Sequence, residues 1–387
     1  MKRTKHVALL IETSREYGRG LLRGVTSYHR EQADWSIYFK PQGLGAPPPP
    51  WLAGWKGDGI LARIDDRRMA RAVQGTGLPV VDLRGALDDL GLPAIGVDNR
   101  EVARLGVQHL RDCGLRHFAF CGVPPGTNRH DDQRCDYFRH EVKALGYECS
   151  VFANWRTWDV WERGQQAIAA WLAALPKPVG VMTCHDERGQ QVLDACRRVA
   201  LGVPDEVAVI SVDNDAYLCN LTIPPMTSVD VNPERNGYQA ARLLDRLMRG
   251  RRPLARSIYL PPRCVVTRQS TDTVAVVDPE VAAVVRFIRD HACTGISIDQ
   301  ALARATISRS TLTRRFKQLL NRTPMAELTR VRVQHAKNLL LETDLPMRAI
   351  ASRSGFQEAK YFIEAFHRQV GRTPGRFRKQ AKAEQPD

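Results

Sequence analysis

The sequence ALARATISRSTLTRRFKQLLNRTP at Ala301–Pro324 has a second, similar copy, AIASRSGFQEAKYFIEAFHRQVGRTP, at Ala349–Pro374. Each copy begins with a short Ala-rich segment, passes through a turn into a longer segment with a Phe near its middle, and ends in Arg-Thr-Pro. Phe316 and Phe366 occupy matching positions in the two copies. Two short helices joined by a tight turn are typical of the helix-turn-helix unit, whose second helix lies in the major groove of DNA.

The longer segment of the first copy predicts a recognition helix with one buried face. Ser308 is the expected N-cap, because its hydroxyl can accept from a free backbone N–H of the first turn. Leu312, Phe316 and Leu319 recur at helical spacing and form the apolar stripe that must face a core. The residues left on the outer face, which can bind base edges or phosphates, are Arg309, Ser310, Thr313, Arg314 and Lys317.

The second copy predicts a second recognition helix with a different outer face. Phe362, Phe366 and Val370 form its apolar stripe. A carboxylate such as Glu364 can accept from the amino group of cytosine. The residues expected to face outward are Ala359, Lys360, Ile363, Glu364 and His367.

The charge of the chain supports a polyanionic partner for this part. A single helix with such a pattern is more simply explained by a solvated charged face. Here the pattern occurs twice with matched turns and ends, which favours the DNA-binding interpretation. Residues 275–387 hold 20 Lys and Arg against 11 Asp and Glu, an excess of +9 within a chain total of +15.

This region resembles the DNA-binding domain of the AraC family, in which a long linker helix joins two helix-turn-helix units. The linker helix is expected from Met325 to about Leu341, and it would hold the two recognition helices in successive segments of the major groove. Thr306 stands in the first turn where the family usually has Gly. The matching residues are Leu312, Phe316, Lys317, Arg332, Ala336, Leu339, Leu340, Ile350, Ala351, Gly355, Phe356, Tyr361, Phe362, Phe366, Gly371, Thr373, Pro374, Phe377 and Arg378.

Residues 1–272 alternate short β-branched runs with amphipathic stretches, which predicts parallel sheets built from βαβ units. The expected strands are Val7–Ile11, Gly59–Leu61, Val80–Leu83, Ile95–Val97, His117–Cys121, Gly180–Cys184 and Val207–Val212. The expected helices are Gly20–Arg30, Val102–Cys113, Gln133–Leu145, Glu187–Ala200 and Pro233–Arg249, and Pro47–Pro50 is expected to be a loop.

Polar residues follow several of these strands, at the edge where parallel sheets bind ligands. Each residue alone is typical of a cap or a surface turn, but their recurrence at strand ends predicts a binding cleft. Carboxylates that accept hydroxyl protons, an Arg that donates and an aromatic face together suit a polyol. The expected effector-binding residues are Glu12, Thr13, Tyr17, Arg134, His185, Asp186, Asp213 and Asn214.

This first part resembles the sugar-binding repressor type of the periplasmic-binding-protein fold. Its join to an AraC-type domain resembles the xylose operon regulator family over nearly the whole chain. The resemblance implies an α/β two-lobed sensor with parallel sheets, followed by an all-α domain with two helix-turn-helix units. The segments that carry it in the sensor are Ile95–Asn99, Gly106–Leu110, Gly114, Phe118–Phe120, Val207–Asn214, Gly237–Leu244 and, at the domain junction, Asp278–Pro279 and Phe287–Cys293.

The resemblance implies a homodimer that binds a double-stranded DNA operator and responds to a pentose such as xylose. Our own hypothesis is that it activates transcription, although the sequence does not give the sign of regulation. RNA polymerase is a further expected partner of an activator. Arg134 and Asp213 are the expected contacts to sugar hydroxyls. The expected division is a sensor at 1–272, a linker at 273–280, a DNA-binding domain at 281–380 and a disordered tail at 381–387. The residues at Glu12, Thr13 and Gly18 depart from the pattern of the enteric xylose regulators.

Three alternatives remain open from the sequence. A transport-type solute-binding protein is disfavoured, because we expect no signal peptide and because the C-terminal helix pairs speak against it. No membrane span is expected, and the expected location is cytoplasmic. An enzyme built on Cys184-His185-Asp186 is disfavoured, because sequence neighbours rarely form a catalytic set. The scattered, odd-numbered Cys residues indicate no disulfide framework and no zinc site, and no metal or cofactor is expected. A DNA-binding regulator whose first domain binds a non-sugar ligand, or only dimerises, is the remaining alternative.

Overall fold

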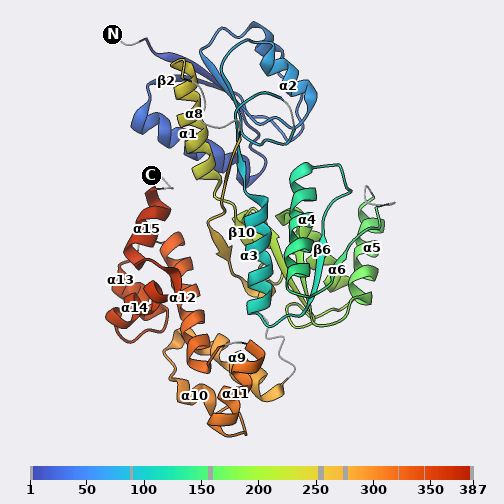
Figure 1. Cartoon of the computed structure of the whole chain (residues 1–387), viewed down its shortest axis with the longest axis vertical. Coiled ribbons are helices and arrows are strands. Elements are labelled where there is room, and N and C mark those ends of the chain that lie inside the picture. The colour runs from blue at the N-terminus through green and yellow to red at the C-terminus, as the bar shows by residue number, and fades with distance from the viewer. Residues whose placement is uncertain are drawn as a thin grey trace.

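The computed structural model describes residues 3–87, 90–155, 160–251, 257–272, 278–320, 322–343 and 345–383. Figure 1 shows two α/β lobes and a separate helical domain formed by the C-terminal part of the chain. The first lobe holds the N-terminus, and the helical domain lies beside the second lobe. This arrangement agrees with the two-lobed sensor and the all-α domain predicted from the sequence.

The first lobe is a six-stranded sheet in the order β11-β5-β4-β3-β1-β2, with every pairing parallel. Strands β3, β4 and β5 are buried throughout and β1 is buried from Val7 to Leu10, as expected of a sheet covered by helices on both faces. The strands are β1 (Lys5–Leu10), β2 (Trp35–Phe39), β3 (Gly59–Ala62), β4 (Val80–Asp82), β5 (Ala94–Val97) and β11 (Ser257–Leu260). The helices are α1 (Glu16–Gln32), α2 (Arg67–Gln74), α8 (Pro233–Met248) and the 3-10 helix η1 (Pro50–Gly54).

The second lobe is a six-stranded sheet in the order β12-β10-β9-β8-β6-β7, parallel except for β12 against β10. Its strands are β6 (His117–Cys121), β7 (Cys149–Val151), β8 (Val179–Thr183), β9 (Val207–Val212), β10 (Thr227–Asp230) and β12 (Cys264–Val266). Its helices are α3 (Asn99–Asp112), α4 (Arg129–Ala144), α5 (Trp161–Ala174), α6 (Asp186–Arg198), α7 (Ala216–Leu221) and the 3-10 helix η2 (Gln269–Thr271).

The chain crosses between the lobes at three places, namely after β5, after β10 and between β11 and β12. All strands and helices predicted in residues 1–272 are present, with ends shifted by up to four residues. The prediction missed the edge strands β2, β7, β11 and β12, whose alternating or partial burial leaves a weak apolar signal. It also missed β10 and the helices α2, α5 and α7.

The helical domain consists of α9 (Pro279–His291), η3 (Ala292–Thr294), α10 (Ile298–Leu302), α11 (Arg309–Leu320), α12 (Pro324–Glu342), α13 (Met347–Arg353), α14 (Ala359–Val370) and α15 (Pro374–Ala383). Leu312 and Phe316 of α11 pack into one core with α9, and Phe362 and Phe366 of α14 pack into a second core with α13 and α15. The long helix α12 contributes to both cores (Figure 1). Four of the six residues in the predicted apolar stripes are therefore buried, and Leu319 and Val370 are half-buried at the edges of the two cores.

The predicted linker and tail fall partly outside the described residues. Residues 273–277 and 384–387 are not described. Asp278 caps α9 by accepting from the N–H groups of Glu280 and Val281, at 3.0 and 3.2 Å. At the other end, α15 extends through Ala383. Within the described residues, no helix is both long and apolar enough to cross a membrane.

Candidate effector cleft and nucleic-acid interface

A cavity lies between the two lobes, at the carboxyl ends of β1, β3, β4, β8 and β9. Parallel sheets bind ligands at this edge. Of the residues predicted from the sequence, Tyr17, Arg134, His185 and Asp213 line it. The other lining residues are Arg15, Arg63, Arg84, Val97, Asn128, His130 and Asp131. We call these eleven residues the effector cleft.

Each of the four guanidinium groups in the effector cleft has a carboxylate partner. Arg15 forms a two-pronged ion pair with Glu187, at 2.8 and 2.5 Å. Arg63 donates to Glu12 at 2.9 Å, and Arg84 is paired with Asp65. Arg134 lies 3.4 Å from Asp213. The cationic side chains of the cleft are therefore largely balanced by acidic neighbours.

Arg134 is fixed from three sides by the second lobe. Its Nε donates to Asn99 Oδ1 at 3.1 Å, and its Nη1 donates to the backbone carbonyl of Cys184 at 2.5 Å. Its Nη2 faces Asp213 Oδ1. Asp213 itself has φ of 103°, a backbone conformation that non-glycine residues rarely adopt and that is often found at functional sites. The pair is thus held in one geometry at the floor of the cavity.

Burial perturbs the pKa of several residues of the effector cleft, among them His185 and Asp131. Burial, reinforced by Arg15 and Arg134, lowers the pKa of His185 to about 3, so its ring is neutral near pH 7. The Nδ1 atom of His185 accepts from the N–H of Arg188 at 3.3 Å, which leaves the proton on Nε2 as a donor. Burial, opposed by Arg134, raises the pKa of Asp131 to about 6.

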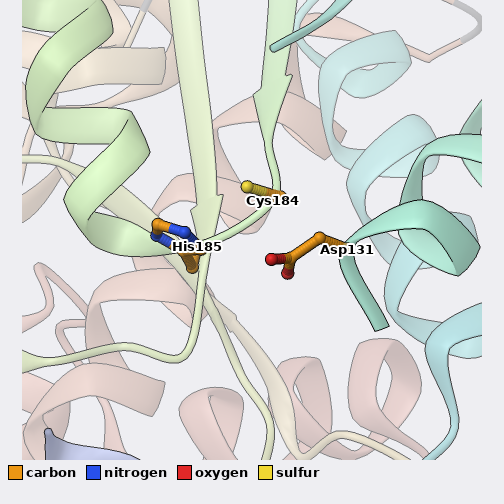
Figure 2. Close-up of side chains that lie close together, drawn as sticks. All are labelled: Asp131, Cys184 and His185. Atoms are coloured by element: carbon orange, nitrogen blue, oxygen red, sulfur yellow. The ribbon is translucent and has the colours of Figure 1, made fainter. Parts of the chain in front are cut away.

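Asp131, Cys184 and His185 bring potential metal-ligand atoms within 4.8 Å of one another. Figure 2 shows Cys184 and His185 just after β8 and Asp131 on α4, with the carboxyl group of Asp131 pointing toward the other two residues. Arg134 Nη1 lies 3.9 Å from Asp131, so a metal cation would meet a guanidinium beside its ligands. Burial raises the pKa of Cys184 well above its ordinary value, which favours the thiol over the thiolate that binds metals or attacks substrates. This chemistry disfavours both a metal site and a nucleophile.

The remaining residues predicted for the effector have structural contacts outside the cavity wall. Glu12 lies behind Arg63, and Thr13 bonds through its backbone to Gln42 at 3.1 Å. Asp186 is buried and accepts from Ser228 Oγ at 2.7 Å and from the N–H of Asp215 at 2.6 Å. Asn214 accepts from Arg268 at 2.9 Å.

Sequence reasoning missed several residues of the effector cleft. Arg63 and Arg84 follow the predicted strands Gly59–Leu61 and Val80–Leu83, so the same strand-end argument could have found them. Asn128, His130 and Asp131 lie at the start of α4, whose first turn was placed four residues too late. Arg15 had no signal beyond its nearness to Glu12 and Tyr17.

The first recognition helix, α11, presents the predicted face to solvent. Arg309, Ser310, Arg314 and Lys317 are exposed, and Thr313 is half-buried. With Gln318 they surround one shallow hollow of the surface. Ser308 caps the helix as predicted, because its Oγ accepts from the N–H of Thr311 at 3.3 Å.

The second recognition helix, α14, also presents most of its predicted outer face to solvent. Lys360, Ile363, Glu364 and His367 are exposed, whereas Ala359 is half-buried and touches the core. Gly371 ends α14 with φ of 74°, the left-handed conformation that glycine adopts readily. The outer face of α14 therefore mixes one cation, one carboxylate and an apolar side chain, unlike the cationic face of α11.

The turn of the first unit is held by a contact from α9. Glu280 accepts from both the N–H and the hydroxyl of Thr306, at 2.7 and 2.6 Å. Thr306 is not among the described residues with positive φ. Thr306 thus stands in place of the glycine of the AraC pattern, and Glu280 of α9 holds it from outside the first helix-turn-helix unit.

Three family models match the chain. A XylR N-terminal domain matches residues 6–94, a periplasmic binding protein-like domain matches residues 107–271, and a helix-turn-helix domain matches residues 302–380. The first range covers β1 to β4 of the first lobe, and the second covers most of the second lobe together with α8 and β11 of the first. The third range covers α11 to α14 and most of α15.

Two curated relatives match over nearly their whole length. The xylose operon regulatory protein of Escherichia coli (strain K12) is 31% identical over 96% of this chain and 96% of its own. The protein of the same name from Haemophilus influenzae is 30% identical over 96% of this chain and 97% of its own. The solved structure of a xylose-binding transcription activator, xylR, matches with a TM-score of 0.65 and 29% identity over 98% of this chain and 99% of that chain.

The sensor alone has the fold of a cellobiose-bound regulator, CelR, with a TM-score of 0.55, 23% identity and 69% of this chain covered. That likeness shows the fold of the two lobes. The matches over the full length join both lobes and the helix-turn-helix units in one architecture. The chain belongs to the family of xylose operon regulatory proteins, which are DNA-binding transcription regulators and not enzymes.

Proposed function

We propose that a neutral pentose, D-xylose in the first instance, binds in the effector cleft and controls binding of the helix-turn-helix units to an operator. The observation that carries this proposal is the charge balance of the cleft. Arg15, Arg63, Arg84 and Arg134 each have a carboxylate partner, so the site offers paired donors and acceptors with little uncompensated positive charge. Such a site favours a polyol over a sugar phosphate, which needs unpaired cations.

The lining groups match the surface of a pyranose. Asp213 and Asp131 can accept from hydroxyl groups, and Arg134 and the Nε2–H of His185 can donate to them. The ring of Tyr17 supplies an apolar face for C–H groups of the sugar. The relatives whose names include xylose support the choice of D-xylose as the first ligand to test.

The two lobes already touch across the mouth of the cleft. Arg15 and Arg19 of the first lobe pair with Glu187 and Asp215 of the second, the latter at 3.3 Å. A sugar that contacts both lobes would add to these contacts and favour the closed arrangement. It can shift the equilibrium only by its difference in affinity for the two arrangements.

On the DNA side, α11 and α14 are proposed to enter successive segments of the major groove. We further propose that the protein acts in the cytoplasm as a homodimer and activates transcription with RNA polymerase. The side chains of Tyr217, Leu221 and Ile223, on and just after α7, are 76%, 72% and 66% exposed, and this apolar surface is available for a second copy.

The test is thermal unfolding of the full chain with D-xylose, D-ribose, L-arabinose, D-glucose and D-xylose 5-phosphate. A ligand that binds only the folded protein raises the unfolding midpoint by mass action. We expect a concentration-dependent rise with a pentose, no rise with the phosphate, and loss of the rise in Asp213→Ala. Asp136→Ala is the matched control, because Asp136 is an exposed carboxylate on α4, the helix that carries Arg134.

A rise with the sugar phosphate alone would contradict the charge argument. No rise with any of these compounds would favour the alternative in which the first domain binds a non-sugar ligand or only dimerises. Either result would leave the DNA-binding assignment unchanged, because that assignment rests on the helical domain and on the relatives.

A further inference from the structure

Helix α3 joins the effector cleft to the helical domain. Its first residue, Asn99, is 3% exposed and bonds to three residues of α4. Asn99 Oδ1 accepts from Arg134 at 3.1 Å, and Asn99 Nδ2 contacts His130 Nδ1 at 2.8 Å and Gln133 Oε1 at 2.9 Å. Asn99 therefore positions two residues that line the cavity, and it stands directly after the crossing from β5 to the second lobe.

The last turn of α3 meets the helical domain. The backbone carbonyl of Asp112, the final residue of α3, accepts a hydrogen bond from Arg322, which lies just before α12. Arg330 and Arg289 are near enough to this end of α3 to lower the pKa of His109, although burial is the larger cause. Cations are favourable at a helix C-terminus, where unpaired carbonyl groups carry partial negative charge.

The same end of α3 is tied to the end of the sensor. His109 Nε2 and Cys113 Sγ bond to the hydroxyl and the carbonyl of Thr271, at 2.8 and 3.3 Å. The next residue, Asp272, forms an ion pair with Arg289 of α9 at 3.5 Å. The C-terminal turn of α3 is thus bonded both to the α12 side and, through Thr271 and Asp272, to the α9 side of the helical domain.

Helix α3 is suited to transmit a displacement. It has 14 residues and is therefore about 20 Å long. Val102, Val107 and Leu110 anchor one side of it in the core of the second lobe. Figure 1 shows α3 running along the side of that lobe next to the helical domain. Because successive turns of a helix are bonded to one another through their backbone N–H and C=O groups, a shift of the first turn of α3 moves its last turn as well.

We propose that α3 is the link by which occupancy of the effector cleft changes the docking of the helical domain, with Asn99 and Arg322 as its two terminal contacts. This proposal rests on the proposed function for the identity of the trigger. Arg134 donates to Asn99, to the carbonyl of Cys184 and to Asp213. Sugar hydroxyls that bond to Arg134 and Asp213 would change how Arg134 shares its hydrogen bonds. Asn99, which accepts from Arg134, would then shift with it. A helix shift of about 1–2 Å is a common means of such coupling.

The test is hydrogen–deuterium exchange on the full chain, followed in peptides that cover Arg322 to Glu342, with and without saturating D-xylose. In the wild type, D-xylose should change protection in these peptides. In Arg322→Gln the change should be lost while the D-xylose Kd, measured by calorimetry, stays within about threefold of wild type. Arg104→Gln is the matched control, because Arg104 pairs with Glu101 on the outer face of α3. It should behave as wild type.

A second arm needs no ligand. Asn99→Ala without sugar should alter protection at Arg322–Glu342, and Arg104→Gln should not. If D-xylose binds and Arg322→Gln retains the full wild-type response, the link through α3 is wrong and the sugar assignment stands. If no sugar binds, the proposed function fails, but the experiment with Asn99→Ala still tests the link through α3. Unchanged protection in Asn99→Ala would then refute the link.

Discussion

Two of the clusters of arginine and carboxylate side chains in the described part of the chain have opposite designs. In the effector cleft, four guanidiniums and their partners surround a cavity. In the helical domain, the side chain of Glu327 is enclosed by Arg322 at 3.1 Å, Arg330 at 2.8 Å and Arg289 at 3.7 Å, with 0% of the residue exposed. One cluster leaves room for a ligand, and the other is closed on itself.

The difference is visible in the pKa of a buried carboxyl group in each cluster. For both, burial acts to raise the pKa. Burial prevails for Asp131, whose pKa rises to about 6, because Arg134 is its main cationic partner and Asp213 opposes it. For Glu327 the guanidiniums of Arg330, Arg289 and Arg322 outweigh burial and lower the pKa to about 2. We infer that the closed cluster stabilises the fold, whereas the open cluster keeps its hydrogen-bonding capacity for a ligand.

The largest effect should follow from removing the charge of Glu327. Glu327→Gln leaves three buried or half-buried guanidiniums without their common partner, so we expect a loss of about 3 kcal/mol in the free energy of unfolding of the helical domain. Urea unfolding monitored by circular dichroism measures it. Glu358→Gln, at an exposed position before α14, is the control and should change little. A Gln variant as stable as wild type would mean that the closed cluster adds no net stability.

The stabilisation by Glu327 should also depend on pH. Its folded pKa of about 2 lies below the ordinary value of 4.5, so its contribution is complete above about pH 4.5 and is lost as the pH falls toward 2. The gap in urea midpoint between wild type and Glu327→Gln should therefore be constant from pH 7 to pH 5 and should narrow below that. A gap that stays constant down to pH 3 would contradict the lowered pKa.

In the open cluster, the main effect of a substitution should fall on ligand binding. Arg134→Gln removes a donor that faces the cavity, and hydrogen bonds to charged groups are worth about 1.5–3 kcal/mol, so the D-xylose Kd should rise by about 10- to 100-fold. Arg139→Gln is the control, because Arg139 lies on the same helix, is exposed and pairs only weakly with Asp136, at 4.0 Å. Calorimetry on the full chain provides the Kd. An unchanged Kd would exclude Arg134 from the binding site.

The two clusters also differ in how far the sequence predicts them. The helix-turn-helix units were predictable, because helical spacing is a local pattern and Leu312, Phe316, Phe362 and Phe366 are buried as expected. The cleft was predicted in part, because a strand and the residue after it are also neighbours in sequence. That argument found Tyr17, Arg134, His185 and Asp213 among the lining residues.

The rest of both clusters depends on contacts between distant residues. Arg15 and Glu187 are 172 positions apart, and nothing in either local sequence indicates the pair. Glu327 lies in an ordinary helical segment, and its burial appears only when α9 and the turn before α12 close around it. Similarly, Glu12 and Asp186 were expected at the cavity, but their carboxylates accept hydrogen bonds from neighbouring side chains instead. Arg63 donates to Glu12, and Ser228 donates to Asp186.

The smallest effect on stability and on ligand binding should come from the ion pair of Arg15 and Glu187 at the mouth of the cleft. This pair is neither closed off from water nor part of the open cavity floor. The side chains of Arg15 and Glu187 are 26% and 43% exposed, and water screens such pairs, so Glu187→Gln should cost under about 1 kcal/mol of stability. Because the pair joins the two lobes, it should also favour closure slightly, and its loss should raise the D-xylose Kd by less than about fivefold. Both changes should shrink in 0.5 M salt. The effect of Arg134→Gln should shrink much less, because buried pairs are screened less than exposed ones. A salt-independent effect as large as that of Arg134→Gln would place Glu187 with the ligand contacts instead of with the screened pairs at the surface.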